Sequence, residues 1–209
     1  MIYSMNTDSF SAQQRHNRGS SRRAQMREAL LHSAKTVFAE RGYHDTSIAE
    51  ITTRADMGVG TFYLYFKDKE EIFETIIVEG IEHIKMLVQE AVEAAPEHKF
   101  ETFFRAILQF AYSDRELFRI ALTGEGKKQI AVRAYGSVND GISELLNSAT
   151  EKGYLGNEYP LELLAHFLTG ILNQTVIYWF LQDEPKAEAM ADYFIAFLKN
   201  GVPASLFNF

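Results

Sequence analysis

The stretch from Thr46 to Glu71 reads TSIAEITTRADMGVGTFYLYFKDKEE and decides the fold of this chain. Ser47 and Glu50 have the spacing of a capping box, in which two residues satisfy the free N–H groups at the start of a helix. A tight turn and a second short, tyrosine-rich helix are expected next, and Asp68-x-x-Glu71 repeats the start signal for a third helix. This order predicts a helix-turn-helix, which presents one helix to the major groove of DNA.

The second short helix has an outward face that suits contact with another molecule. At about 100° per residue, Phe62 defines the inward side, and Val59 and Phe66 fall near it. No acidic residue occurs from Met57 to Lys67. Glycine and hydroxyl side chains suit close approach to phosphates and base edges, and an aliphatic side chain suits a thymine methyl group. The predicted DNA contacts on this face and its flanks are Gly60, Thr61, Tyr63, Leu64 and Tyr65.

Phosphate contacts are expected on both sides of this helix. Thr46 and Ser47 lie where the preceding helix presents free N–H groups, which form a natural seat for an anion. Lys69 lies in the first turn of the following long helix, where a cation opposes the helix dipole and is better accommodated if an anion lies nearby. Arg22 and Arg23 adjoin the first helix, and they either contact DNA or belong to a solvated tail.

The charge distribution favours a nucleic-acid partner for the N-terminal part only. The chain of 209 residues has a net charge of −7. Residues 1–69 carry ten Lys/Arg and seven Asp/Glu, a net +3, whereas residues 70–209 carry eleven and twenty-one, a net −10. A basic head on an acidic body is consistent with DNA binding by the head.

Composition limits the compartment and the chemistry. Cysteine is absent, which excludes disulfides and thiolate catalysis and fits a reducing, cytoplasmic location. The most apolar run, Leu161 to Leu181, is long enough to raise the question of a membrane span. It carries Glu162, His166, Asn173 and Gln174, so a buried helix is expected and no membrane contact is predicted.

The rest of the chain predicts an all-α protein. Residues 1–21 are polar and arginine-rich and are expected to form a flexible basic arm. Residues 22–68 contain the helix-turn-helix, and residues 69–209 form a larger helical body that begins with a long helix ending near Val92. Within that body, glycine and proline breakers separate five further predicted helices at residues 99–112, 114–122, 127–152, 161–181 and 186–199.

Aromatic residues of the body belong either to a packed core or to a pocket for an apolar effector, and helical periodicity does not separate the two. The predicted helix 161–181 also has a polar stripe that either lines a cavity, crosses a dimer seam or faces water. The candidate pocket residues are Phe103, Phe104, Ile107, Phe110, Tyr135, Asn139, His166 and Asn173.

The last two predicted helices are apolar on wide faces. Paired with the same helices of a second copy, they would form a four-helix seam, although a monomeric core gives the same pattern. One helix-turn-helix reads little DNA by itself, and this favours a homodimer. The candidate interface residues are Ile171, Tyr178, Phe194 and Phe197.

Residues Ala29 to Phe73 closely resemble the N-terminal DNA-binding domain of the TetR/AcrR regulators. The resemblance lies in FAERGY at 38–43, TSI at 46–48 with Ile51, GTFYLYF at 60–66 and KDKE at 67–70. One departure is Asp56, where the family's turn usually has glycine; aspartate tolerates the left-handed conformation, so the turn is expected to survive. The resemblance implies a homodimer that binds a palindromic operator, a ligand pocket in residues 69–209, and release from DNA when a small, largely apolar effector binds.

We therefore interpret the chain as a dimeric, ligand-responsive transcriptional regulator, a repressor in the first instance, with no metal or cofactor. One alternative is a helical protein-interaction module without DNA binding. The replacement of the usual turn glycine by Asp56 and the net negative charge of residues 70–209 are both consistent with it. A second alternative is an enzyme on a helical scaffold, for which Glu79, His83 and His166 are the only candidates and no nucleophile or phosphate loop is evident.

Overall fold

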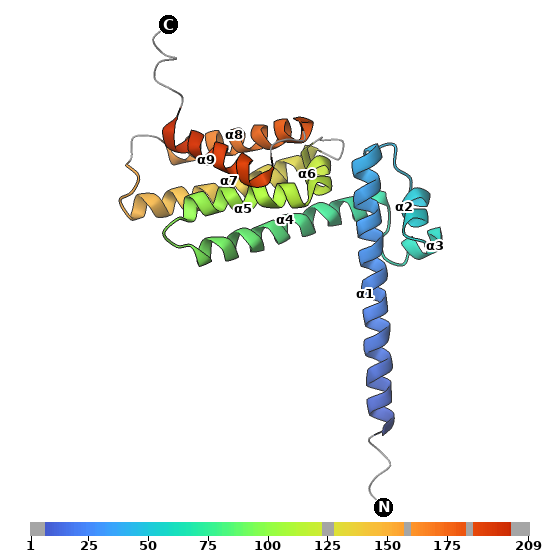
Figure 1. Ribbon diagram of the computed structural model, residues 1–209. Coiled ribbons are helices and arrows are strands. Elements are labelled where there is room, and N and C mark those ends of the chain that lie inside the picture. The colour runs from blue at the N-terminus through green and yellow to red at the C-terminus, as the bar shows by residue number, and fades with distance from the viewer. Residues whose placement is uncertain (1–6, 123–127, 157–159, 183–185, 202–209) are drawn as a thin grey trace, which may run out of the picture. The chain divides into compact units, whose positions relative to one another are not determined.

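The computed structural model describes residues 7–122, 128–156, 160–182 and 186–201, and every regular element within these ranges is an α-helix (Figure 1). This confirms the predicted all-α class. The chain divides into two compact units, Met1–Phe73 and Glu74–Phe209. The predicted breakers at 124–126 and 183–185 lie outside the described residues.

The first unit contains α1 (Thr7–Arg41), α2 (Ile48–Arg54), α3 (Val59–Phe62) and the beginning of α4 (Lys69–Ala94). As predicted, the first helix ends at Arg41, and Gly42 has a left-handed φ of 84°. Such a glycine is a common end of a helix because it lacks the side chain that opposes this conformation. α1 already begins at Thr7, so the structure is helical in most of the segment that the sequence suggests as a flexible arm.

The short helices α2 and α3 depend on packing, since isolated helices of this length are unstable in water. Leu30, Ala34 and Phe38 of α1 are buried, as are Ile51 of α2 and Phe62 of α3. Phe66, Ile72 and Phe73 complete the apolar core of the unit. The rings of Phe38 and Phe73 meet edge to face at 5.3 Å between centroids, which joins α1 to the first turn of α4.

Lys69 ties the start of α4 to the loop between α1 and α2. Its Nζ donates hydrogen bonds to the backbone oxygens of Tyr43 (2.7 Å), His44 (3.3 Å) and Thr46 (2.6 Å). The ammonium group also lies 4.5 Å from the centre of the Tyr43 ring, a cation–π distance. The loop carbonyls therefore stabilise a cation that the helix dipole alone would disfavour.

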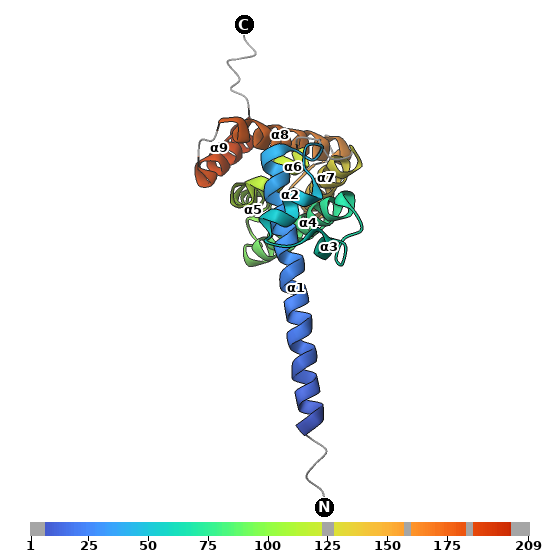
Figure 2. The ribbon, with the colours of Figure 1, turned by 90° about the vertical axis from the view of Figure 1, so that its right-hand side faces the viewer.

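The second unit contains the remainder of α4 and five further helices, α5 (Lys99–Ser113), α6 (Arg115–Leu122), α7 (Lys128–Glu151), α8 (Leu161–Gln182) and α9 (Ala187–Asn200). The predicted bounds agree with these to within one or two residues. Both ribbon views place α5 and α7 between α4 and the pair α8 and α9 (Figure 1, Figure 2). The core of the unit is built around Phe104, Leu108, Ile142, Trp179 and Phe194.

α8 is the one helix in the described residues that is long and apolar enough to cross a membrane by length and composition. Ala165, Leu168, Leu172, Val176 and Trp179 lie along one side of it and belong to the core of the second unit. A core helix passes the same test. The predicted burial holds for this side of α8 only, because Leu163, Phe167 and Tyr178 of the same helix are exposed.

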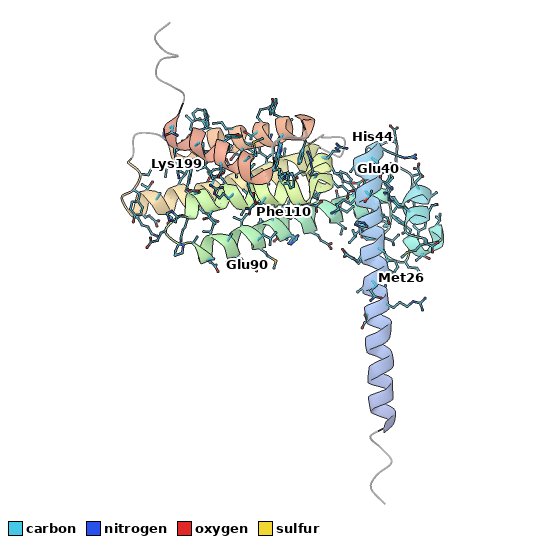
Figure 3. The ribbon with its side chains drawn as sticks, viewed as in Figure 1. Met26, Glu40, His44, Glu90, Phe110 and Lys199 are labelled. Atoms are coloured by element: carbon cyan, nitrogen blue, oxygen red, sulfur yellow. The ribbon has the colours of Figure 1, made fainter. Side chains whose placement is uncertain are left out.

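A cluster of ion pairs attaches α9 to α5. Glu101 accepts from the Lys199 ammonium group (2.8 Å) and from Arg105 (3.0 Å), and Arg105 also pairs with Asp192 (2.7 Å). Lys199 lies near the end of α9 (Figure 3). The hydrogen bond from Lys199, followed by that from Arg105, lowers the pKa of Glu101 below its ordinary value of 4.5.

Replacing Lys69 by methionine is expected to lower the free energy of unfolding by about 1–3 kcal/mol, because three loop carbonyls lose a charged donor. Urea unfolding followed by circular dichroism measures the change. Lys67→Met is the matched control, since the Lys67 side chain is 87% exposed, and it is expected to alter stability by less than about 0.5 kcal/mol. Equal effects of the two substitutions would contradict the structural role of Lys69.

The lowered pKa of Glu101 means that its ionised form stabilises the fold at neutral pH. This contribution is complete above pH 4.5, the ordinary value, and is lost as the pH falls through the lower pKa of the folded state. Glu101→Gln is therefore expected to cost about 0.5–1 kcal/mol at pH 7 and progressively less in acid. Glu97→Gln, at an exposed position, serves as the control. A Glu101→Gln deficit that is the same at pH 7 and pH 3 would contradict this assignment.

Candidate functional site

The turn between α2 and α3 has the backbone geometry of a helix-turn-helix. Asp56 adopts a left-handed φ of 53°, the single non-glycine residue with positive φ in the described part of the chain. The Met57 N–H donates to the carbonyl of Thr52 at 2.8 Å, which closes the end of α2. Aspartate is one of the few residues other than glycine that visit this conformation readily. The expectation that the turn survives without glycine is confirmed.

The face of α3 and of the turn after it is close to the predicted one. Phe62 and Phe66 are 0% and 3% exposed, whereas Tyr63 and Leu64 are 57% and 69% exposed. Gly60 is exposed, and Thr61 and Tyr65 are half-buried. Val59 was expected inside but is exposed, because α3 begins at this residue and no earlier turn of the helix covers it.

The surface beside Gly60 is open. A Cβ atom added at Gly60 would meet no other atom within 4 Å, and the same holds for Gly58 at the start of α3. Packing within the chain therefore does not require glycine at either position. A second molecule can approach the α3 backbone closely at these positions.

The N-terminus of α2 carries the predicted capping box. The Ser47 Oγ accepts from the Glu50 N–H at 3.2 Å, and the Glu50 carboxylate accepts from the Ser47 N–H and hydroxyl, both at 2.8 Å. The Ser47 N–H, then its hydroxyl, lowers the pKa of Glu50, and an ion pair with Arg41 contributes further. A carboxylate thus already occupies the position that the sequence suggested as a seat for phosphate.

Thr46 and Lys69 direct their polar groups into the chain. Thr46 is 3% exposed, and its hydroxyl donates to the Gly42 carbonyl at 2.7 Å. The three N–H bonds of Lys69 each have a loop carbonyl as partner. Sequence reasoning placed both residues correctly at helix starts but did not foresee these partners, which lie in backbone segments that the spacing of side chains does not describe.

Several cations surround the α3 region. Arg22 and Arg23 are exposed on α1. The Arg23 guanidinium lies 5.8 Å from the centre of the Tyr65 ring, and Arg27 lies 5.6 Å from the Phe66 ring. Arg54, by contrast, is paired with Glu40 of α1 at 2.8 Å (Figure 3). α1 therefore places positive charge beside the residues that follow α3.

The second unit contains a largely apolar pocket of about 380 Å³ that is partly open to solvent, here called the apolar cavity. α4, α5, α6, α7 and α8 all contribute to its wall. Of the eight predicted pocket residues, four line it: Ile107, Phe110, Tyr135 and Asn173. Thr169, from the polar stripe of the predicted helix 161–181, and Phe118, one of the aromatic residues considered for a pocket, also line it. Residues that the prediction missed include Ile77, Gly80, Leu117 and Val138.

The other four predicted pocket residues lie elsewhere. Phe103 and Phe104 are 6% and 0% exposed and belong to the core, and Phe103 also lines a separate, more polar space between α4, α5 and α7. The Asn139 side chain accepts a 3.2 Å hydrogen bond from the Thr169 hydroxyl. It therefore contacts a residue that lines the apolar cavity without lining the cavity itself. His166 is exposed, and its ring stacks on that of Tyr135 with 6.2 Å between centroids.

Three of the four predicted interface residues are exposed, and one is buried. Ile171, Tyr178 and Phe197 are exposed, at 37%, 56% and 43%. Phe194 is 4% exposed and packs against Phe104, so it is a core residue of the same chain. Further exposed apolar side chains on α8 and α9 that the prediction missed are Leu163, Phe167 and Tyr193.

The residues considered for catalysis lie on two helices, with Glu79 and His83 on α4 and His166 on α8. His83 of α4 packs edge-on against the Phe110 ring at 5.3 Å between centroids, whereas His166 lies on α8. Within the described residues, no group of three His, Asp or Glu side chains is placed to hold a metal ion.

Comparison with known proteins places this geometry in a family. Residues 30–76 match the family model described as "Bacterial regulatory proteins, tetR family". The HTH-type transcriptional regulator YdgC of Bacillus subtilis is 26% identical over 163 residues, 73% of this chain and 80% of that protein. The fatty acid metabolism regulator protein of the same organism is 24% identical over 165 residues, 74% of this chain and 84% of the relative.

A solved structure shares the fold. The transcriptional regulator FadR of Bacillus subtilis in complex with stearoyl-CoA superposes with a TM-score of 0.72 at 20% identity, covering 84% of this chain and 98% of that one. Together with the helix-turn-helix geometry of α2 and α3, the family match shows that the chain carries a DNA-binding domain of the TetR family, and the relatives that are similar over most of its length are transcriptional regulators.

Proposed function

We propose that the chain is a cytoplasmic, homodimeric repressor that binds a palindromic operator and is released by a small, largely apolar effector. The observation that carries the DNA-binding part is the exposed, acid-free surface of Gly60, Tyr63 and Leu64 on a TetR-family helix-turn-helix. The Tyr63 ring packs edge-on against Phe62 at 5.5 Å between centroids and leaves 57% of the residue exposed, and Leu64 is 69% exposed. The open space beside Gly60 admits another molecule.

In this proposal the side chains near α3 have distinct roles. Tyr63 and Leu64 read base edges, with Gly60 and Thr61 allowing and supporting close approach. Tyr65, Arg22 and Arg23 contact phosphates and set the orientation of the unit on the duplex. Thr46, Ser47 and Lys69 act indirectly, because their polar hydrogens are engaged within the chain and hold α2 and α4 in place.

The apolar cavity supports an effector with a large hydrophobic part. Its wall is mostly aliphatic and aromatic, with Thr169 and Asn173 among the few polar groups. A mostly apolar wall with a few polar groups is the usual composition of a small-molecule site. The relative named for fatty acid metabolism and the neighbour solved with stearoyl-CoA agree with an alkyl-chain ligand.

α4 offers a route by which an effector changes DNA binding. Ile77, Gly80, Ile81 and Ile84 of this helix line the apolar cavity, and the same helix begins at Lys69 in the DNA-binding unit. α6 packs directly on its backbone: a Cβ atom at Gly80 would lie 2.5 Å from a methyl carbon of Leu117. An effector that separates α6 from α4 would change the direction of the α4 axis. The distance between the two recognition helices of the dimer would change with it.

The exposed apolar side chains of α8 and α9 support the dimer. Leu163, Phe167 and Ile171 follow one another at four-residue spacing along α8, and Tyr193 and Phe197 do so on α9. Covered by the same surface of a second copy, they would form a four-helix seam. Two recognition helices about 34–36 Å apart would then reach successive major grooves.

Substitutions near α3 test the assigned roles. Tyr63→Ala and Leu64→Ala are expected to cost about 1–3 kcal/mol on the preferred operator and to relax sequence preference, with little loss on unrelated DNA. Arg23→Ala is expected to weaken binding to all sequences about equally, because phosphates are common to every sequence.

Selection from a random DNA pool followed by fluorescence anisotropy measures both effects. The roles would be reversed if Arg23→Ala altered the selected sequence while Tyr63→Ala and Leu64→Ala weakened all binding uniformly.

A further inference from the structure

The apolar cavity adjoins a second, more polar space between α4, α5 and α7. This polar cleft has a volume of about 660 Å³. Ile84, Ile107, Ser137 and Val138 line both spaces, so they form a common wall between them. The Phe103 ring and Gly141 both line the polar cleft. They are so close that a Cβ atom added at Gly141 would lie 2.8 Å from a carbon of the Phe103 ring. The two spaces therefore adjoin each other and differ in the chemistry of their linings.

The charges of the polar cleft are unequal. Three carboxylates line it, Glu93 of α4 and Asp140 and Glu144 of α7, against the two cations Lys85 and Lys99. Lys85 is paired at 3.3 Å with Glu82, which is not part of the wall, and this offsets its charge. The Glu93 carboxylate accepts only a neutral amide donor, Gln89, at 2.8 Å.

Asp140 and Glu144 are one helical turn apart and both exposed. In the part of the chain that the structure describes, neither has an ion-pair or hydrogen-bond partner for its side chain. Two like charges on neighbouring turns of a helix are mildly unfavourable without a counter-charge. The wall includes no arginine, the residue that most often holds phosphate through paired hydrogen bonds.

We infer that the effector is an amphiphile whose apolar tail fills the apolar cavity and whose cationic, amine-bearing head lies in the polar cleft beside Asp140 and Glu144. The inference rests on the proposed function, because it specifies the chemistry of the same effector. It also separates this chain from the neighbour solved with stearoyl-CoA, whose head carries several phosphate charges that the three carboxylates would repel.

Three ligands with the same twelve-carbon tail test the inference on the full chain: dodecylamine, dodecanol and dodecanoyl-CoA. Each is titrated calorimetrically below the concentration at which it aggregates. Dodecylamine is expected to bind about fivefold to tenfold more tightly than dodecanol, in line with two partly exposed charge pairs, and dodecanoyl-CoA more weakly than dodecanol.

The double variant Asp140→Asn, Glu144→Gln is expected to remove the preference for the amine while leaving dodecanol binding unchanged. Glu162→Gln, Glu188→Gln removes the same charge at exposed positions outside the polar cleft and should keep the preference. Ala134→Phe, which fills the apolar cavity, should abolish binding of all three ligands while DNA binding persists.

The possible failures are distinguishable. Equal binding of the three ligands, or tightest binding of dodecanoyl-CoA, would overturn the assigned head group and leave the apolar effector of the proposed function standing. An amine preference that also disappears in Glu162→Gln, Glu188→Gln would reduce the effect to the net charge of the chain and overturn the inference. No binding of any ligand by a chain that still binds DNA would overturn both the effector cavity and the inference.

Discussion

The anchoring of the Lys69 ammonium group by loop carbonyls is the interaction on which the arrangement of the DNA-binding unit depends. The carbonyls of Tyr43, His44 and Thr46 belong to the connection between α1 and α2, and Lys69 is the first residue of α4. The bonds therefore fix the entry to α2 and the exit from the α3 region at the same point. With Phe38 against Phe73, they hold two very short helices at a defined position on α1.

The same helix connects the two sites of the molecule by covalent continuity. α4 starts at the carbonyl cluster and supplies Ile77, Gly80 and Ile84 to the apolar cavity about two to four turns later. A helix transmits displacement well because its backbone hydrogen bonds keep it stiff. The proposed response to an effector therefore requires no further element between the two sites. It requires only a ligand that binds more tightly to one orientation of α4 than to another.

Prediction from the sequence succeeded where side-chain periodicity carries the information. The buried Phe62 and Phe66 and the exposed Tyr63 and Leu64 follow from 100° spacing, and helix ends follow from Gly42 and Ser47. It did not foresee the hydrogen bonds of Thr46 and Lys69 within the chain, whose acceptors are backbone carbonyls brought close only by folding. It could not separate the core residues Phe104 and Phe194 from cavity and interface residues, because core, cavity and interface side chains have the same helical period.

The central claim is that the surface of α3 reads DNA, and a binding titration at two salt concentrations tests it most directly. The probe is a labelled fragment from the region beside the chain's own gene, compared with a shuffled fragment of equal length. The proposed function predicts tighter binding to the natural fragment, and a steep loss of affinity for both fragments as salt rises, because phosphate contacts release counterions. Equal affinity for the two fragments, or affinity that does not change with salt, would contradict it.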